Sequence, residues 1–116
     1  MSEPTVFTRI VRGEIPADVV FENERILAIT DIAPKAPVHL LVFPKTQEYA
    51  TVAALAAADL LLLAEMVTVA QTLADAHSGG QFRLVFNSGE EAGQTVFHVH
   101  AHVLGGHLTE GSLATG

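Results

Sequence analysis

Histidine occupies every second position near the end of the chain, at His98, His100 and His102. Successive side chains of a β-strand alternate between its two faces, so a strand over residues 96–104 would present all three imidazoles on one face. The apolar side chains of the other face are Phe97, Val99, Ala101 and Val103. Such a strand predicts a sheet that packs against a helix on one side and carries a row of imidazoles on the other.

A row of imidazoles suits two kinds of chemistry. Neighbouring histidines could share a metal ion if a carboxylate or the remote His39 completed the site, and Glu90 and Glu91 are the carboxylates nearest in sequence. An imidazole with an ordinary pKa of about 6.5 can instead act as a nucleophile, base or acid at neutral pH. A single histidine is more often structural, but three in strict alternation favour a functional role.

The rest of the chain predicts the other elements of an α+β domain. A helical segment runs from an N-cap at Thr51 to about His77, where a glycine pair ends it. Its apolar face is Leu62, Leu63, Met66, Val67, Ala70, Leu73 and Ala74. A short helix is predicted over residues 6–12, and the remaining strands over 19–22, 25–30, 38–43 and 82–86. We expect a five-stranded antiparallel sheet with the long helix packed against one face.

The composition limits both the size and the partners of the domain. With 116 residues, of which 49% are apolar and 16% charged, the chain predicts one globular domain over residues 1–116. Its net charge of −7 argues against binding to a nucleic-acid polymer or an anionic membrane. The absence of cysteine excludes disulfides, thiolate zinc sites and thiol nucleophiles. The sequence shows neither a signal peptide nor an uncharged apolar run of membrane-spanning length, so a cytoplasmic location is expected.

A polar loop leads into the histidines over residues 87–95. Gly93 would let the main chain approach a ligand closely, and Gln94 and Thr95 add an amide and a hydroxyl. Exposed N–H groups in such a turn can bind an anion. An ordinary connection between strands is the simpler interpretation of the loop alone, but beside the imidazoles it indicates phosphoryl chemistry.

Four segments of the sequence resemble the histidine triad superfamily of nucleotide hydrolases and transferases. HVHAHVL over residues 98–104 is similar to the His-φ-His-φ-His-φ-φ signature, in which φ is an apolar residue. The other three segments are FTRIVRGEIP (residues 7–16), DIAPKAPVH (31–39) and GQTVFH (93–98). Together they extend over about residues 6–106 and leave 107–116 as a loosely held tail. The Gly105-Gly106 ending is most similar to the Hint branch, the histidine triad nucleotide-binding proteins.

The resemblance implies covalent catalysis at the α-phosphate of a nucleotide. His100 would attack the phosphorus of a nucleoside monophosphate ester, amide or anhydride, and water would then hydrolyse the nucleotidyl-histidine. His98, His102 and His39 would orient His100 and the phosphate oxygens. Thr95 would help to protonate the leaving group, and neither a metal nor another cofactor is expected.

The resemblance also implies which residues bind the nucleotide, a purine nucleotide with an AMP or GMP moiety. Asp31 would accept hydrogen bonds from the ribose hydroxyls, and Asn87 would contact the ribose and phosphate. Main-chain N–H groups near Gly93 and Thr95 would stabilise the developing negative charge, with Gln94 near the scissile bond. The residues that match the base pocket are Val6, Phe7, Ile10, Ile29, Ile32 and Leu41.

Several of these residues also have a simpler structural explanation. Asp31 could form a turn before Pro34. His39 could be a hydrogen-bonded core histidine, because Leu41 and Phe43 share its strand face. The apolar side chains of the short helix would be core residues in any protein with this helix.

Departures from the family pattern bear on the substrate. Thr8 stands where some bacterial relatives carry a cysteine of a structural zinc site. Thr95 stands where the Hint branch usually has serine, a choice shared with the dinucleoside polyphosphate hydrolase branch. Residues 107–116 lack the aromatic and proline residues that end some Hint proteins. We expect a purine nucleoside phosphoramidase. The alternatives are a dinucleoside polyphosphate hydrolase and a nucleotide- or partner-binding protein with incidental activity.

The family resemblance further implies a homodimer. It would form through the long helix and the fourth strand and join the two sheets into one of ten strands. Leu61, which falls among polar residues of the helix, would then be a subunit contact rather than a stray exposed leucine.

Overall fold

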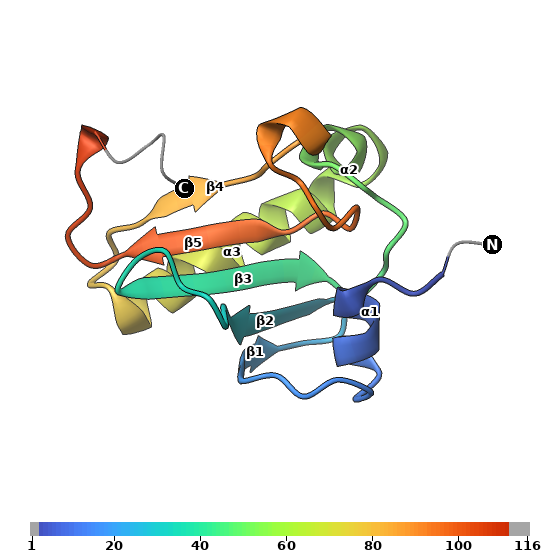
Figure 1. Ribbon diagram of the computed structural model, residues 1–116, viewed down its shortest axis with the longest axis horizontal. Coiled ribbons are helices and arrows are strands. Elements are labelled where there is room, and N and C mark those ends of the chain that lie inside the picture. Colours follow the sequence, from blue (N-terminus) through green and yellow to red (C-terminus); the bar gives the residue numbers. More distant parts are fainter. Residues whose placement is uncertain (1–2, 112–116) are drawn as a thin grey trace.

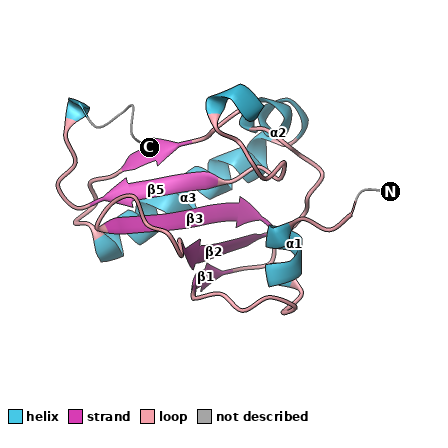
Figure 2. Ribbon diagram, in the orientation of Figure 1, coloured by secondary structure: helices cyan, strands magenta, loops and turns pink. Residues whose placement is uncertain are grey.

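The computed structural model describes residues 3–111. One antiparallel sheet has the strand order β1–β2–β3–β5–β4, with helices on both faces (Figures 1 and 2). The strands are β1 (Val19–Glu22), β2 (Ile26–Thr30), β3 (Val38–Pro44), β4 (Arg83–Val85) and β5 (Ala101–Gly105). The helices are α1 (Val6–Val11), α2 (Val52–Ala58), α3 (Leu60–His77) and the 3-10 helix η1 (Glu90–Ala92). The predicted α+β class and the five-stranded antiparallel sheet are confirmed.

Apolar side chains form two cores on opposite faces of the sheet. Residues of β2 and β3 alternate between the cores, as the two-residue period of a strand requires. The core beneath α3 is Ile26, Ala28, Leu40, Val42, Leu55, Leu62, Met66, Val69, Ala70, Leu73, Val99, Ala101 and Val103. The smaller core beneath α1 is Phe7, Leu27, Ile29, Leu41 and Phe43. In Figure 1, α3 crosses behind the sheet, and α1 lies on the near side by the end of β3.

The helical segment predicted from Thr51 to His77 is divided in two at Asp59. The main chain of Asp59 leaves the helical conformation, with φ −148° and ψ 77°. Its carboxylate accepts a hydrogen bond from the N–H of Leu62 at 3.1 Å and so caps α3. The same carboxylate pairs with Arg25 at the start of the β2 segment. An acidic cap within the apolar run therefore produces α2 and α3 in place of one helix.

The buried face of α3 is close to the prediction but is rotated slightly. Leu62, Met66, Ala70, Leu73 and Ala74 are buried as expected. Val69 is buried in place of Val67, which is 42% exposed, and Leu63 is only partly buried. The outer face of α3 therefore carries more apolar surface than the sequence indicated.

The strand that carries the histidines is shorter than predicted. Residues 96–104 were expected to be extended throughout, but the ladder with β3 ends at the pair Val42 and Ala101. β3 ends in Pro44, which has no N–H to donate. Ahead of β5, the N–H of Val99 donates instead to the carbonyl oxygen of Tyr49 at 2.8 Å. Phe97, predicted on the core face, is half-exposed.

β4 forms one edge of the sheet, and the outer face of α3 exposes apolar side chains. β4 is the last strand on its side, and its three residues are partly buried. On the outer face of α3, Leu61 is 78% exposed and Leu60 is 66% exposed. None of the helices in the described part of the chain has the length and apolar character needed to cross a membrane. Residues 112–116, part of the tail predicted over 107–116, lie outside the described range.

Candidate active site

The main chain of His98 holds the ring of His100 in one orientation. The Nδ1 atom lies 2.8 Å from the carbonyl oxygen of His98. A carbonyl oxygen can only accept a hydrogen bond, so Nδ1 donates, and in the neutral ring Nε2 keeps its lone pair. Burial lowers the pKa of His100, against the opposing effects of this hydrogen bond and of Asp31. At neutral pH the ring is therefore a neutral imidazole with a basic nitrogen at Nε2.

His98 uses both of its ring nitrogens inside the protein. Its side chain is fully buried, and Nε2 lies 2.7 Å from the carbonyl oxygen of Pro44, to which it must donate. Nδ1 then accepts, and its partner is the hydroxyl of Thr5 at 2.7 Å. Burial is the main cause of the lowered pKa of His98. This arrangement places His98 to support His100 rather than to contact a phosphate oxygen.

A chain of hydrogen bonds fixes the protons of His39 and His102. The main-chain N–H of Lys35 donates to Nδ1 of His39 at 2.9 Å, so the proton of His39 lies on Nε2. That Nε2 is 2.9 Å from Nδ1 of His102, which must accept. The proton of His102 is therefore on its Nε2. Burial, together with His100 and His39, lowers the pKa of His102 to about 4, so the ring is neutral at neutral pH.

The Nε2 atom of His102 is buried and has no hydrogen-bond partner within residues 3–111. A buried donor without a partner is unfavourable by about 1–3 kcal/mol, and such groups are rare in folded proteins. The ring of His102 lies beside that of His100, with their centroids 5.2 Å apart. The free N–H of His102 therefore lies next to the free lone pair of His100. An acceptor oxygen bound near His100 would give the N–H of His102 its missing hydrogen bond.

Asp31 forms the predicted turn and also lies beside the histidines. One carboxylate oxygen accepts from the N–H of Ala33 at 2.7 Å and forms a turn. The other lies 3.3 Å from Nε2 of His39, so the carboxylate also borders the histidine cluster. Sequence spacing did not predict this contact, because the predicted carboxylates were Glu90 and Glu91, which lie exposed in η1.

Asp31, His39 and His102 place one possible metal-ligand atom each within 4.8 Å of one another. A metal ion on Nε2 of His39 would require the ring proton to lie on Nδ1. That nitrogen already faces the N–H of Lys35, and two donors cannot share this contact. The hydrogen bonds of His39 therefore favour a proton-ordered chain over a metal site.

The loop over residues 87–95 holds its shape through a buried amide. Gln94 is 2% exposed, and its Nε2 donates to the carbonyl oxygens of Ala50 at 2.6 Å and Val96 at 3.0 Å. Its Oε1 accepts from the N–H of Gly89 at 2.9 Å. Both N–H groups of this amide are used within the protein, so Gln94 braces the loop.

The other predicted residues of the loop lie closer to the surface. Gly93 has a φ of +94°, a conformation that side chains disfavour, and it ends η1. Asn87 lies beside it, because a Cβ on Gly93 would be 3.9 Å from the Asn87 amide nitrogen. Thr95 is exposed and lines a shallow cleft of about 430 Å³ with Val96, Phe97 and the start of α1.

Most of the residues predicted to bind a base lie in α1 or in the core beneath it. Phe7 stacks on Phe43 at a centroid distance of 4.5 Å and meets the edges of the His98 and His100 rings at 5.5 and 4.8 Å. The other apolar residues of this set differ in burial. Ile29 and Leu41 are buried, Ile10 is partly buried, Val6 is 40% exposed and Ile32 is 97% exposed.

Known proteins are similar to this chain in sequence and in fold. The family model described as scavenger mRNA decapping enzyme C-term binding matches residues 4–115. A HIT-like protein of Synechocystis is 47% identical over 107 residues, which cover 91% of this chain and 93% of the relative. The crystal structure of a HIT family hydrolase from Legionella pneumophila superposes with a TM-score of 0.83 at 46% identity, over 89% of this chain and 93% of that one. The chain belongs to the histidine triad family. The purine nucleoside phosphoramidase of Escherichia coli is 38% identical over 108 residues, which cover 91% of this chain and 90% of the relative.

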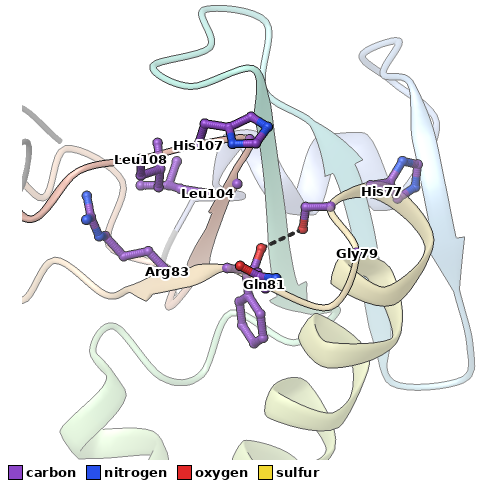
Figure 3. Close-up of a pocket in the computed structure, with 11 residues that line it drawn as sticks. His77, Gly79, Gln81, Arg83, Leu104, His107 and Leu108 are labelled. Carbon is purple, nitrogen blue, oxygen red and sulfur yellow. Dashed lines mark hydrogen bonds between the residues drawn. The ribbon is translucent and has the colours of Figure 1, made fainter.

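A larger cleft lies away from the histidine triad. It has a volume of about 670 Å³ and is formed where α3 ends and β4 begins, together with the end of β5 (Figure 3). The hydroxyl of Ser78 donates to the carbonyl oxygen of Gln81 at 2.8 Å and shapes this turn. None of the triad residues lines the cleft, so size alone does not identify the reactive centre.

Sequence reasoning missed the groups that orient the triad. Thr5, the carbonyl oxygen of Pro44 and the main-chain N–H of Lys35 each fix one ring nitrogen. Thr5 carries a detectable signal, because threonine before a short apolar helix is typical of an N-cap. The two main-chain groups carry none, since any residue provides them.

Proposed function

We propose that the protein is a nucleotidyl hydrolase that acts on purine nucleoside phosphoramidates through His100. Two neighbouring ring nitrogens support this most. Nε2 of His100 carries a lone pair, and Nε2 of His102 carries an N–H without a hydrogen-bond partner within residues 3–111. A nucleophile needs an unprotonated nitrogen, and the phosphate that it attacks needs a donor for its oxygen. The hydrolases and the phosphoramidase among the relatives support the same assignment.

The first step would transfer the nucleotidyl group to the enzyme. Nε2 of His100 attacks the α-phosphorus, and the bond from phosphorus to the leaving nitrogen breaks. The leaving amine takes a proton, for which the exposed hydroxyl of Thr95 is the proposed route. Nδ1 of His100 keeps its hydrogen bond to the carbonyl oxygen of His98, which stabilises the positive charge on the substituted ring.

The second step would release the nucleotide. Water attacks the phosphorus, the bond to Nε2 of His100 breaks, and the product is a nucleoside monophosphate. The proton that water loses balances the one taken up by the amine. Throughout, Nε2–H of His102 would donate to a non-bridging phosphate oxygen, a contact that becomes stronger as that oxygen gains charge.

The remaining predicted residues have places consistent with nucleotide binding. Asp31 lies at the rim with one carboxylate oxygen available for ribose hydroxyls besides its contact to His39. Ile32, next in sequence, is almost fully exposed, and a purine stacked over it would cover this apolar surface. Asn87 and the main chain around Gly93 would contact the phosphate side.

A substrate panel tests this function against its alternatives. Adenosine and guanosine phosphoramidates should be cleaved faster than diadenosine polyphosphates, measured as kcat/KM. The reverse order would assign the protein to the polyphosphate hydrolases, which share Thr95. Tight binding of purine monophosphates with negligible turnover on both classes would indicate a binding protein.

We also propose that two copies pair through α3 and β4. Leu60 and Leu61 expose apolar surface on α3, and β4 is the last strand on its side of the sheet. A second copy related by a two-fold axis would cover the leucines and extend the sheet at β4. Antiparallel pairing of the two β4 strands would join the sheets into one of ten strands.

A further inference from the structure

The hydroxyl of Thr5 reaches the first histidine of the triad from the opposite end of the chain. Its Oγ1 lies 2.7 Å from Nδ1 of His98, a contact between residues 93 positions apart in sequence. Nε2 of His98 donates to the carbonyl oxygen of Pro44, so Nδ1 bears the lone pair and Thr5 must donate. The proton of this one hydroxyl thus determines which form of His98 is stable.

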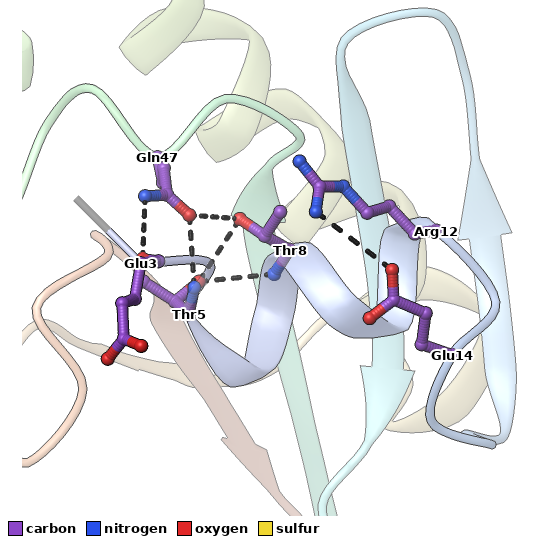
Figure 4. Close-up of polar contacts among 6 residues, drawn as sticks. All are labelled: Glu3, Thr5, Thr8, Arg12, Glu14 and Gln47. Atoms are coloured by element: carbon purple, nitrogen blue, oxygen red, sulfur yellow. Dashed lines mark hydrogen bonds and ion pairs between the residues drawn. The ribbon is translucent and has the colours of Figure 1, made fainter. Parts of the chain in front are cut away.

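The other polar contacts of Thr5 leave its proton for His98. Figure 4 shows these contacts, which Thr5 makes with Thr8 and Gln47. Thr5 Oγ1 accepts from the N–H of Thr8 at 3.1 Å, which also caps α1. The hydroxyl of Thr8 donates to Oε1 of Gln47 at 2.6 Å, and the same oxygen accepts from the N–H of Thr5 at 3.0 Å. The contact from Thr5 Oγ1 to Thr8 Oγ1 is longer, at 3.2 Å, than the one to His98. The single proton of Thr5 therefore belongs to the His98 bond.

His98 in turn holds the nucleophile. Its carbonyl oxygen accepts the Nδ1–H of His100 and so keeps the Nε2 lone pair free. If Nδ1 of His98 lost its donor, the buried ring would have to turn or take up a second proton. Either change would shift the main chain that orients His100 or place a positive charge beside it.

We propose that Thr5 is a positioning residue for His100, acting through the tautomer of His98. The kinetic part of this proposal rests on the proposed function, but the effect of Thr5 on the His98 ring does not. The two can therefore be tested separately, by nitrogen NMR of the imidazoles and by steady-state kinetics.

Four substitutions separate the hydrogen bond to His98 from the capping of α1. Thr5→Ser keeps both roles. Thr5→Asp keeps the cap, because a carboxylate accepts from Thr8 N–H, but it cannot donate to His98. Thr5→Val removes both roles. The matched control is Thr8→Val, which disrupts the same polar cluster at Gln47 without touching the His98 bond.

We expect nitrogen NMR to show His98 of the wild type, Thr5→Ser and Thr8→Val with a proton on Nε2 alone. In Thr5→Asp, both nitrogens should be protonated. The kcat of Thr5→Asp and Thr5→Val should fall about tenfold or more with KM changed less than about twofold. Deprotonation of His98 in Thr5→Asp would remove the positive charge. The kcat of Thr5→Asp should therefore reach its maximum at a higher pH than the kcat of the wild type.

Two results would overturn the proposal. One is a His98 ring that keeps its single Nε2 proton in Thr5→Asp, with far-UV circular dichroism confirming that the variant is folded. The other is a kcat for Thr8→Val reduced as much as that for Thr5→Asp, since that would show only a structural role for the cluster. If the wild type hydrolysed no nucleotide, the NMR comparison would still decide the role of Thr5, and only the proposed function would be lost.

Discussion

His39 donates an N–H to His102 across 2.9 Å, and this contact determines which nitrogen of His102 faces the reactive centre. The order of protons begins at the main-chain N–H of Lys35, which every substitution except proline retains. The tautomer of His102 is thus set by His39 and the main chain of Lys35, which lie outside the triad. Because Nε2 of His102 carries an N–H, it would attract a phosphate oxygen bound near His100. A lone pair at the same nitrogen would repel that oxygen.

Replacing His39 should therefore slow chemistry with little effect on nucleotide binding. His39→Phe keeps an aromatic ring in the buried position but leaves Nδ1 of His102 without a donor. We expect kcat to fall about tenfold to a hundredfold, as for other groups that orient a catalytic residue, with KM changed less than about threefold. Lys35→Gln, which retains the main-chain N–H, is the control and should stay within about twofold of the wild type in steady-state assays.

Loss of the proposed nucleophile, His100, should have a much larger effect. His100→Ala removes Nε2 but leaves the donor of His102 and the residues proposed to bind the nucleotide. Turnover should fall by several orders of magnitude, whereas nucleoside monophosphate binding, measured by calorimetry, should weaken by only about 1–2 kcal/mol. Quenching the wild type in alkali, where a bond from phosphorus to histidine survives, should trap an adduct on His100. Near-normal turnover by His100→Ala would replace covalent catalysis with direct attack by water.

Acid should destabilise the fold because of the buried histidines. The pKa values of His39, His98, His100 and His102 are lowered, chiefly by burial, while an unfolded histidine titrates near about 6.5. Below that pH the unfolded chain binds protons that the native state does not. The free energy of unfolding is therefore greatest above that pH and decreases as the pH drops toward the pKa values of the native histidines. His102, with its pKa of about 4, can account for at most about 3 kcal/mol of this loss.

Urea unfolding at a series of pH values between 7.5 and 4.5 measures this slope. His102→Asn should give a shallower dependence than the wild type. His77→Gln, at the exposed end of α3, should leave the slope unchanged. Equal slopes for all three proteins would show that the triad does not control acid sensitivity.

The proposed pairing through α3 predicts a dimer in solution that one charge can disrupt. Leu61→Asp should give a monomer mass by light scattering at micromolar concentrations, because the carboxylates of two copies would meet in an apolar contact. Val19→Asp is the matched control, since Val19 is a half-exposed apolar residue on β1, at the other edge of the sheet. A wild type that is monomeric at these concentrations would contradict the pairing.

Catalysis should survive removal of metal ions. The tautomer of His39 opposes a metal at the Asp31, His39 and His102 cluster, so extended dialysis against a chelator should leave kcat/KM unchanged. Calorimetric titration of the dialysed protein with zinc should show no tight site. Activity lost on dialysis and restored by zinc would identify the cluster as a metal centre after all.

Periodicity predicted the sheet and the side on which the histidines lie, but not where β5 begins. The alternation of His98, His100 and His102 indicates one face, and the rings do cluster on the α1 side through Phe7. The end of the ladder depends on Pro44 in a strand distant in sequence, and local pattern holds no information on which main-chain groups remain to be paired.

The same limit applies to the polar residues of the site. Gln94 and Asp31 have the residue types expected at a nucleotide site, yet one braces a loop from inside while the other reaches the histidines. The sequence does not indicate which of these two polar residues faces the interior. Only the path of the main chain, set by the loop over residues 87–95 and by the turn at Ala33, distinguishes them.

β5 begins at Ala101, so the strand includes His102 but not His100. His102 is held in a strand that is hydrogen-bonded on both sides, by β3 and by β4. The ring of His100 is held instead by the carbonyl oxygen of His98 and by packing against Phe7. In the proposed reaction, the ring that carries phosphorus from an amine to water therefore lies outside the strand ladders, while the N–H that binds the phosphate oxygen lies within them.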